Sequence, residues 1–177
     1  VATGLAYLQG ISIPTIHIRV EALTGWLLDR MQNLRHANGT PLFRIYGPLG
    51  TNRRGGTIAC NFIDPAGHII DERLIESEAA AARISIRTGC FCNPGAGEAA
   101  FKLDPVFLSN QLGGDTMLVY DEFLKQLGME SGGAIRISVG LVSNIADIEA
   151  FLAFAQTFLN RAITPADLTP LPERKHC

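Results

Sequence analysis

The segment GAIRISVGL alternates apolar and polar side chains and constrains the fold more than any other stretch of the chain. In an extended conformation Ile135, Ile137 and Val139 project to one side. Arg136 and Ser138 project to the other side. Such alternation is typical of a strand with one buried face. The sheet that contains it therefore has an apolar face for helices to cover and a polar face that carries an arginine.

Three further segments are predicted to be strands. They span residues 42–48, 55–64 and 84–89. The polar, glycine-rich sequence TNRRGG joins the first two and favours a β-hairpin. In the third, Ile84 and Ile86 face one way and Arg87 faces the other. Arg87 and Arg136 are therefore predicted to share the face that the isoleucine rows leave uncovered.

Helical patterns separate these strands. The strongest covers residues 14–39, where apolar side chains recur at three- and four-residue steps, with Pro14 in the first turn and Gly39 just after the end. Further helices are predicted after the N-caps Asp71, Asp115 or Thr116, and Asn144, the last with the capping-box partner Asp147. The final helix carries an apolar stripe from Ile148 to Leu159, and residues 93–114 show only a weak pattern.

The predicted order is helix, strand, strand, helix, strand, helix, strand, helix. Because this order lacks regular βα alternation, we expect an α+β fold with a small, largely antiparallel sheet and helices packed on one face. The predicted domain covers residues 1–162, and residues 163–177 form a Pro-rich tail or linker. The chain begins without Met, in a sequence typical of the middle of a helix, so we expect it to be a fragment of a larger protein.

Composition argues against several classes of function. The net charge is −2 and the isoelectric point is near 6.1, so we expect no nucleic-acid partner. No apolar run is long enough to cross a membrane. The four cysteines do not form a disulfide framework, which favours a cytoplasmic protein with reduced thiols. Cys60 lies in an apolar run and is predicted to be a buried core residue.

The motif RTGCFCNPG, from Arg87 to Gly95, is the first candidate site because it exposes Cys90 and Cys92 in a turn sequence. Zinc normally takes four ligands, and no second pair of cysteines or histidines is spaced to complete a site. A disulfide across one intervening residue would be strained. From the residues alone, a nucleophile activated by Arg87 and an unreactive pair of loop thiols stay equally open.

Arg136 is the second candidate. An arginine between isoleucines is costly to bury without a partner, so it must pair with a carboxylate of the protein, bind a carboxylate ligand, or lie in solvent on an edge strand. The planar guanidinium suits two-point recognition of a carboxylate.

The motifs RTGCFCNPGAGE and GAIRISVGLVSNIADIEAFLAF, together with LRHANGTPLFRIYGP, resemble the C-terminal small domain of class V aminotransferase-like enzymes. These are fold-type I, pyridoxal-phosphate-dependent proteins that include cysteine desulfurases and molybdenum cofactor sulfurases. The resemblance covers almost the whole chain, from about Leu5 to Phe158. It implies that the chain supplies part of the active site of a larger sulfurtransferase.

The resemblance also implies roles for individual residues. Cys92 occupies the place of the cysteine that takes sulfur from the substrate as a persulfide, with Cys90 as the alternative. Arg136 occupies the place of the arginine that binds the substrate carboxylate, with Arg87 beside it. The implied substrate is an amino acid, cysteine above all, and the sulfur passes on to an acceptor.

Pyridoxal phosphate in such enzymes is bound to a lysine of a large domain. Lys102, Lys125 and Lys175 do not match that lysine's motif, so we expect no cofactor on this chain and no activity from it alone. The full-length protein is expected to be a homodimer that holds the cofactor in its large domain. The alternatives are an aminotransferase, C–S lyase or epimerase of the same fold, and a non-catalytic sulfur-relay or interaction module.

Overall fold

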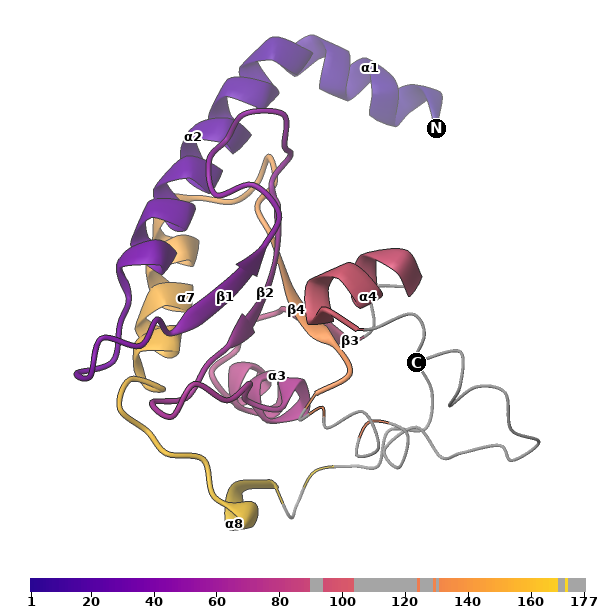
Figure 1. Cartoon of the computed structure of the whole chain (residues 1–177). Coiled ribbons are helices and arrows are strands. Elements are labelled where there is room, and N and C mark those ends of the chain that lie inside the picture. Colours follow the sequence, from indigo (N-terminus) through magenta and orange to yellow (C-terminus); the bar gives the residue numbers. More distant parts are fainter. Residues whose placement is uncertain (90–93, 104–123, 125–128, 130, 169–170, 172–177) are drawn as a thin grey trace.

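The computed structural model describes residues 1–89, 94–103, 124, 129, 131–168 and 171 of the 177-residue chain. The helices are α1 (Ala2–Ile11), α2 (Ile13–Asn33), α3 (Glu72–Ala81), α4 (Pro94–Phe101), α7 (Ile145–Gln156) and α8 (Pro165–Leu168). The strands are β1 (Phe43–Tyr46), β2 (Thr57–Phe62), β3 (Arg87–Gly89) and β4 (Ala134–Ser138) (Figure 1).

The four strands form one sheet in the order β1-β2-β4-β3, and every neighbouring pair is antiparallel. β1 and β2 form the predicted hairpin, with Phe43 opposite Phe62. β4 lies between β2 and the short edge strand β3. The predicted α+β class with a small antiparallel sheet is therefore confirmed.

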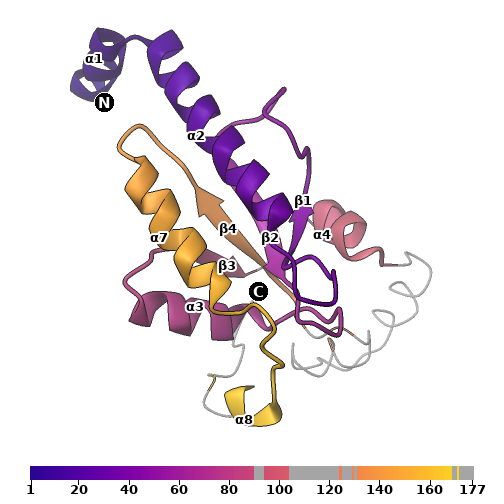
Figure 2. The ribbon, with the colours of Figure 1, turned by 90° about the vertical axis from the view of Figure 1, so that its left-hand side faces the viewer.

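The core lies between one face of this sheet and the helices α2, α3 and α7. α2 and α7 run side by side across that face (Figures 1 and 2). Phe62 of β2 is fully buried and contacts the rings of Phe43, Phe151, Phe154 and Phe158 at centroid distances between 4.6 and 6.5 Å. An aromatic cluster thus joins the β1–β2 hairpin to α7 and to the turn after it.

α2 buries Leu27, Leu28 and Met31, as its apolar stripe predicts, but it ends at Asn33 and not near Gly39. The next residue, Leu34, is extended, and the carbonyl of Leu34 accepts a hydrogen bond from the N–H of Leu42. Residues 35–41 form a loop in which Gly39, with φ +88°, makes the turn. The hydrogen bond between Leu34 and Leu42, the residue before β1, therefore ends α2 earlier than the sequence pattern suggests.

The predicted caps of two helices are confirmed. The carboxylate of Asp71 accepts a hydrogen bond from the N–H of Arg73 at the start of α3, at 2.9 Å. Asn144 and Asp147 form a complete capping box at the start of α7. α7 ends at Gln156, so Phe158 of the predicted stripe is buried from the turn that follows the helix.

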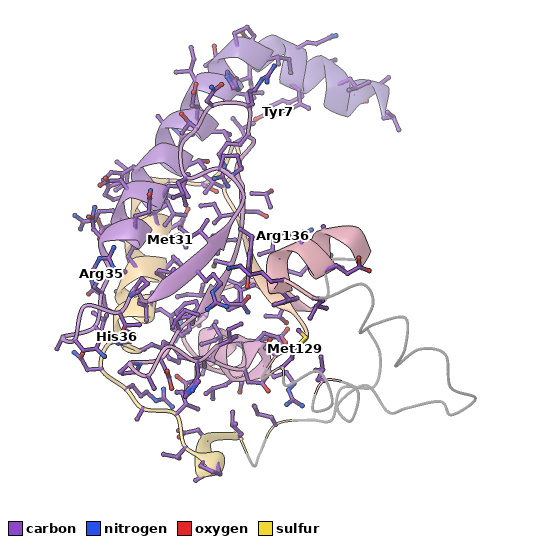
Figure 3. All side chains as sticks on the ribbon, in the orientation of Figure 1. Tyr7, Met31, Arg35, His36, Met129 and Arg136 are labelled. Atoms are coloured by element: carbon purple, nitrogen blue, oxygen red, sulfur yellow. The ribbon has the colours of Figure 1, made fainter. Side chains whose placement is uncertain are left out.

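His36 is a buried connection between three segments (Figure 3). Its Nδ1 accepts a hydrogen bond from the N–H of Asn160 at 2.9 Å, and its Nε2 lies 2.8 Å from the carbonyl oxygen of Ile63. Because Nδ1 accepts, Nε2 is the nitrogen that carries the proton. The loop after α2 is thereby joined to the end of β2 and to the turn after α7.

α4 is a helix that the sequence pattern did not indicate, and it departs from the predicted one-sided layout. Its Phe101 contacts the ring of Tyr46 at a centroid distance of 6.0 Å. Tyr46 alternates with the core-facing Ile45 along β1, so α4 lies on the opposite side of the sheet from α2 and α7 (Figure 1). Of the helix predicted over residues 117–128, Leu124 alone is among the described residues, where it is helical and buried.

The segment after α7 is attached by charged contacts. Arg161 donates to Glu78 of α3 at 2.8 Å and to Asp167 of α8 at 2.9 Å. The predicted tail thus includes one short helix, and the proposed domain boundary at residue 162 stays a prediction. No helix in the described part of the chain is long and apolar enough to cross a membrane.

Candidate functional site

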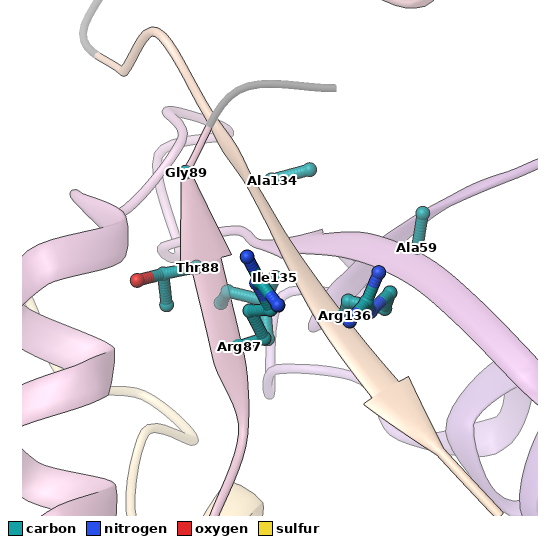
Figure 4. A pocket seen from close by; sticks show the side chains of 7 residues that line it. All are labelled: Ala59, Arg87, Thr88, Gly89, Ala134, Ile135 and Arg136. Atoms are coloured by element: carbon teal, nitrogen blue, oxygen red, sulfur yellow. The ribbon is translucent and has the colours of Figure 1, made fainter. Parts of the chain in front are cut away.

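Two arginines lie side by side on the face of the sheet opposite the core. Arg87 of β3 is directly opposite Arg136 of β4, and Ala59 of β2 flanks Arg136 on its other side. Both arginines are exposed, as predicted from the alternation of their strands. Figure 3 shows Arg136 on the side of the sheet away from Met31 of the core, and Figure 4 shows both guanidinium groups beside β4.

The arginine pair lines a small open pocket of about 120 Å³. The lining residues are Ala59, Arg87, Thr88, Gly89, Ala134, Ile135 and Arg136. Like charges directly opposite each other in a sheet are destabilising. Within the described residues, neither guanidinium has a hydrogen bond or an ion pair that would offset this repulsion. The arrangement is suited to an anion that interacts with both groups.

A buried polar network lies next to this pocket. Asn61 of β2 is fully buried; its amide oxygen accepts from the hydroxyl of Tyr46 at 2.7 Å, and its amide nitrogen donates to the carbonyl of Gly133 at 3.0 Å. Burial raises the pKa of Tyr46 above its usual value of 10, which keeps the phenol protonated as a donor. Sequence analysis did not single out Asn61, although an amide inside the apolar run TIACNFI is a signal that could have done so.

The network continues to the start of α3. The hydroxyl of Ser131 contacts a carboxylate oxygen of the buried Glu72 and also accepts from the N–H of Gly133 at 3.3 Å. The Ser131 hydroxyl has a single proton to donate. It donates that proton to the carboxylate of Glu72, because a hydrogen bond to a charged acceptor is the stronger one. Residues 131–133, which lead into β4, are therefore held from both β2 and α3.

The chain was compared with known proteins, and no family model matches it. Molybdenum cofactor sulfurases do match. One from Drosophila mojavensis is 31% identical over 146 residues, and one from Neurospora crassa is 33% identical over 162 residues. A third, from Arabidopsis thaliana, is 28% identical over 155 residues. The chain is homologous to molybdenum cofactor sulfurases.

The three matches cover 81%, 89% and 85% of this chain. They cover only 19%, 17% and 19% of the sulfurases themselves, so the chain spans less than a fifth of the length of these relatives. The predicted resemblance to this group is confirmed. Most of each of these sulfurases lies outside the part that this chain matches.

The cysteines predicted to react, Cys90 and Cys92, lie outside the described residues. Gly89 ends β3, and Cys90 follows it directly in the sequence. The assignment of Cys92 as nucleophile, with Cys90 as the alternative, therefore stays a prediction. Cys60 is described and is not a candidate, because burial raises the pKa of its thiol to about 12.

The described residues do not fit the lysine-bound pyridoxal phosphate that the resemblance to molybdenum cofactor sulfurases implies. A Schiff-base lysine needs a desolvated setting, and Lys102, the one lysine among the described residues, is exposed after the end of α4. Lys125 and Lys175 lie outside the described residues. Nor does the described part of the chain contain a group of three or more His, Cys, Asp or Glu side chains placed to hold a metal.

Proposed function

We propose that this chain is the small domain of a sulfurtransferase of the molybdenum cofactor sulfurase type, and that it supplies a nucleophilic cysteine and a carboxylate-binding arginine pair. The observation that carries the proposal is the pairing of Arg87 with Arg136 on the face of the sheet opposite the core, where Arg87 begins the strand that leads to Cys90 and Cys92. The homology to molybdenum cofactor sulfurases supports the same reaction class.

The substrate in this proposal is cysteine. A guanidinium presents parallel N–H donors that match the two oxygens of a carboxylate. Arg136 binds the α-carboxylate, and Arg87 adds a second positive charge beside it. Because the two residues project from paired strands, the sheet fixes the direction from which the amino acid reaches the pocket.

The reaction in this proposal is a transfer of sulfur to the protein. The thiolate of Cys92 forms an S–S bond with the sulfur of the substrate, the substrate's Cβ–S bond breaks, and protonation at Cβ leaves alanine. The protein then holds a persulfide, whose outer sulfur goes on to an acceptor. We place pyridoxal phosphate on residues outside this chain and assign no step of it to the residues described.

The test is to incubate the full-length protein with cysteine and to measure alanine together with sulfur added to the peptide that contains Cys90 and Cys92. Cys92→Ala is expected to abolish both signals. Cys90→Ala is the matched control, because it removes a thiol two residues away, and it is expected to retain both.

Other outcomes would contradict the proposal in distinct ways. Loss of both signals in Cys90→Ala alone would make Cys90 the nucleophile. Turnover of an amino acid that survives both substitutions would favour an aminotransferase, C–S lyase or epimerase. Added sulfur from a persulfide donor, without any alanine from cysteine, would favour a sulfur-relay module.

A further inference from the structure

We propose that Gly133 is a positioning residue for the candidate site, and that the buried Asn61 holds it against Gly89 at the end of β3. This inference rests on the proposed function, because the position of Gly89 bears on catalysis only if the cysteines that follow it react. Gly133 itself is not among the residues that line the pocket.

The first observation is the close approach of two backbones. A Cβ atom added to Gly133 would lie 2.7 Å from the carbonyl carbon and from the carbonyl oxygen of Gly89. Real Cβ contacts are longer than 3.0 Å, and a neighbouring backbone cannot rotate away as a side chain can. Gly133 therefore allows β3 to end directly against the segment before β4. Gly89 itself has φ +120°, a conformation that residues with a Cβ rarely adopt.

The second observation is that Gly133 is held in place. Its carbonyl accepts from the amide of Asn61, and its N–H donates to the hydroxyl of Ser131. Asn61 is itself fixed, because its amide oxygen is bonded to Tyr46, and Ser131 is fixed by Glu72. Each of the two peptide groups on either side of the Gly133 Cα is thus bonded to a buried side chain.

Many of these bonds are inaccessible to water. Asn61 is 0% exposed, Ser131 1% and Glu72 4%. Inside a protein, hydrogen bonds of this kind are stronger than in water, and leaving one partner unsatisfied is costly. Such a network is stiffer than the end of a three-residue edge strand would be by itself. The network therefore fixes the position of the Gly133 backbone against which the backbone of Gly89 packs.

The consequence is that one residue influences both parts of the site. Gly133 precedes β4, which carries Arg136 three residues later, and it supports Gly89, which lies between Arg87 and Cys90 in the sequence. A methyl group at position 133 must push Gly89 away by several tenths of an ångström. Displacements of about 1 Å at a reacting group cost about 100-fold in rate.

The experiment compares Gly133→Ala with Gly140→Ala in the full-length protein. Gly140 lies just beyond the other end of β4, its φ is not in the left-handed region, and an added Cβ would meet nothing within 4 Å. The first measurement is the rate of iodoacetamide alkylation of Cys90 and Cys92, read by mass spectrometry of their peptide. The second is kcat and KM for alanine formation from cysteine.

We expect Gly133→Ala to change the alkylation rate at least about threefold and to lower kcat about tenfold, with a smaller effect on KM. Gly140→Ala is expected to match the wild type in all of these values. Asn61→Leu is a second variant that removes both amide hydrogen bonds without adding a clash at Gly133. It should move alkylation and kcat in the same direction as Gly133→Ala.

Far-UV circular dichroism at the assay temperature shows whether each variant is folded. Folded Gly133→Ala and Asn61→Leu proteins with wild-type alkylation and kcat would overturn the proposal. A Gly140→Ala protein whose alkylation rate and kcat change as much as theirs would also overturn it. So would a failure of both test variants to fold, because Gly133 would then be a requirement of folding alone. The alkylation rates need no desulfuration, so a wild-type protein that forms no persulfide would defeat the proposed function and leave this test standing.

Discussion

The two faces of the sheet are built from the same strands and differ in almost every physical property. On the inner face Ile135 is fully buried against helices, while on the outer face the next residue, Arg136, is exposed and lies beside a second arginine. The inner face gains stability from apolar burial. The outer face carries like charges that oppose folding. Stability and the proposed chemistry are therefore carried by alternate residues of one strand, so they can be changed separately.

The largest expected effect is on the inner face. Phe62→Ala removes the ring at the centre of the aromatic cluster, and buried Phe to Ala changes cost about 3–5 kcal/mol. We expect the free energy of unfolding of this chain, measured with urea, to fall by about that amount. A loss below about 1 kcal/mol would mean that the cluster is not the centre of the core.

Arg136→Ala tests the outer face. We expect kcat/KM for cysteine in the full-length protein to fall about 100-fold, because charge-assisted bonds to a carboxylate are lost, while the free energy of unfolding stays within about 0.5 kcal/mol. Arg44→Ala is the matched control, since Arg44 is also exposed and lies on the same face, in β1. Equal losses in the two variants would show that the face acts only through its general charge.

The thiol of Cys60 lies on the inner face and gives that face a pH-dependent contribution to stability. The folded pKa of Cys60 is raised to about 12 from an ordinary 9, so its contribution to stability is complete below pH 9 and is lost as pH rises toward 12. Relative to Cys60→Ala, the wild type should lose stability over this range with a slope approaching about 1.4 kcal/mol per pH unit.

This pH dependence is measured by urea unfolding of both proteins at several alkaline pH values. The difference between them isolates Cys60, because other groups that titrate in this range are shared. A difference that does not vary between pH 9 and pH 12 would contradict the burial of this thiol. In the native protein at pH 8, iodoacetamide should leave Cys60 unlabelled.

The smallest effect concerns repulsion within the arginine pair. Arg87→Gln keeps a polar side chain of similar reach and removes one of two opposed charges, so we expect a gain of about 0.5 kcal/mol in the free energy of unfolding at low salt. Because salt screens exposed charges, the gain should shrink in 1 M NaCl. Thermal unfolding at two salt concentrations measures it. A loss of stability at low salt would indicate that Arg87 has an attractive partner in this chain.

The sequence predicted correctly which face Arg87, Arg136 and the isoleucine rows occupy, because alternation along a strand is a local property. Arg87 and Arg136 were placed on one face from their neighbours alone, and the caps at Asp71 and Asn144 follow from local hydrogen bonds. The end of α2 was predicted too late, because it depends on pairing between Leu34 and Leu42.

Features that depend on distant contacts were missed. α4 has a weak helical pattern and is placed by contact between Phe101 and Tyr46. The network through Asn61 and Gly133 joins residues far apart in the chain, and no spacing rule indicates it. The motif RTGCFC stays a predicted part of the site, because its two cysteines lie outside the described residues.

The aromatic cluster around Phe62 also has a consequence for how the protein is made. Phe62 emerges from the ribosome well before Phe151, Phe154 and Phe158, which cover it in the folded protein. β2 likewise waits for β4, its central partner in the sheet. A nascent chain that ends between these segments exposes an apolar strand without cover, the kind of surface that chaperones bind. Synthesis of α7 and of the turn after it, which carries Phe158, is therefore the step after which the core can close.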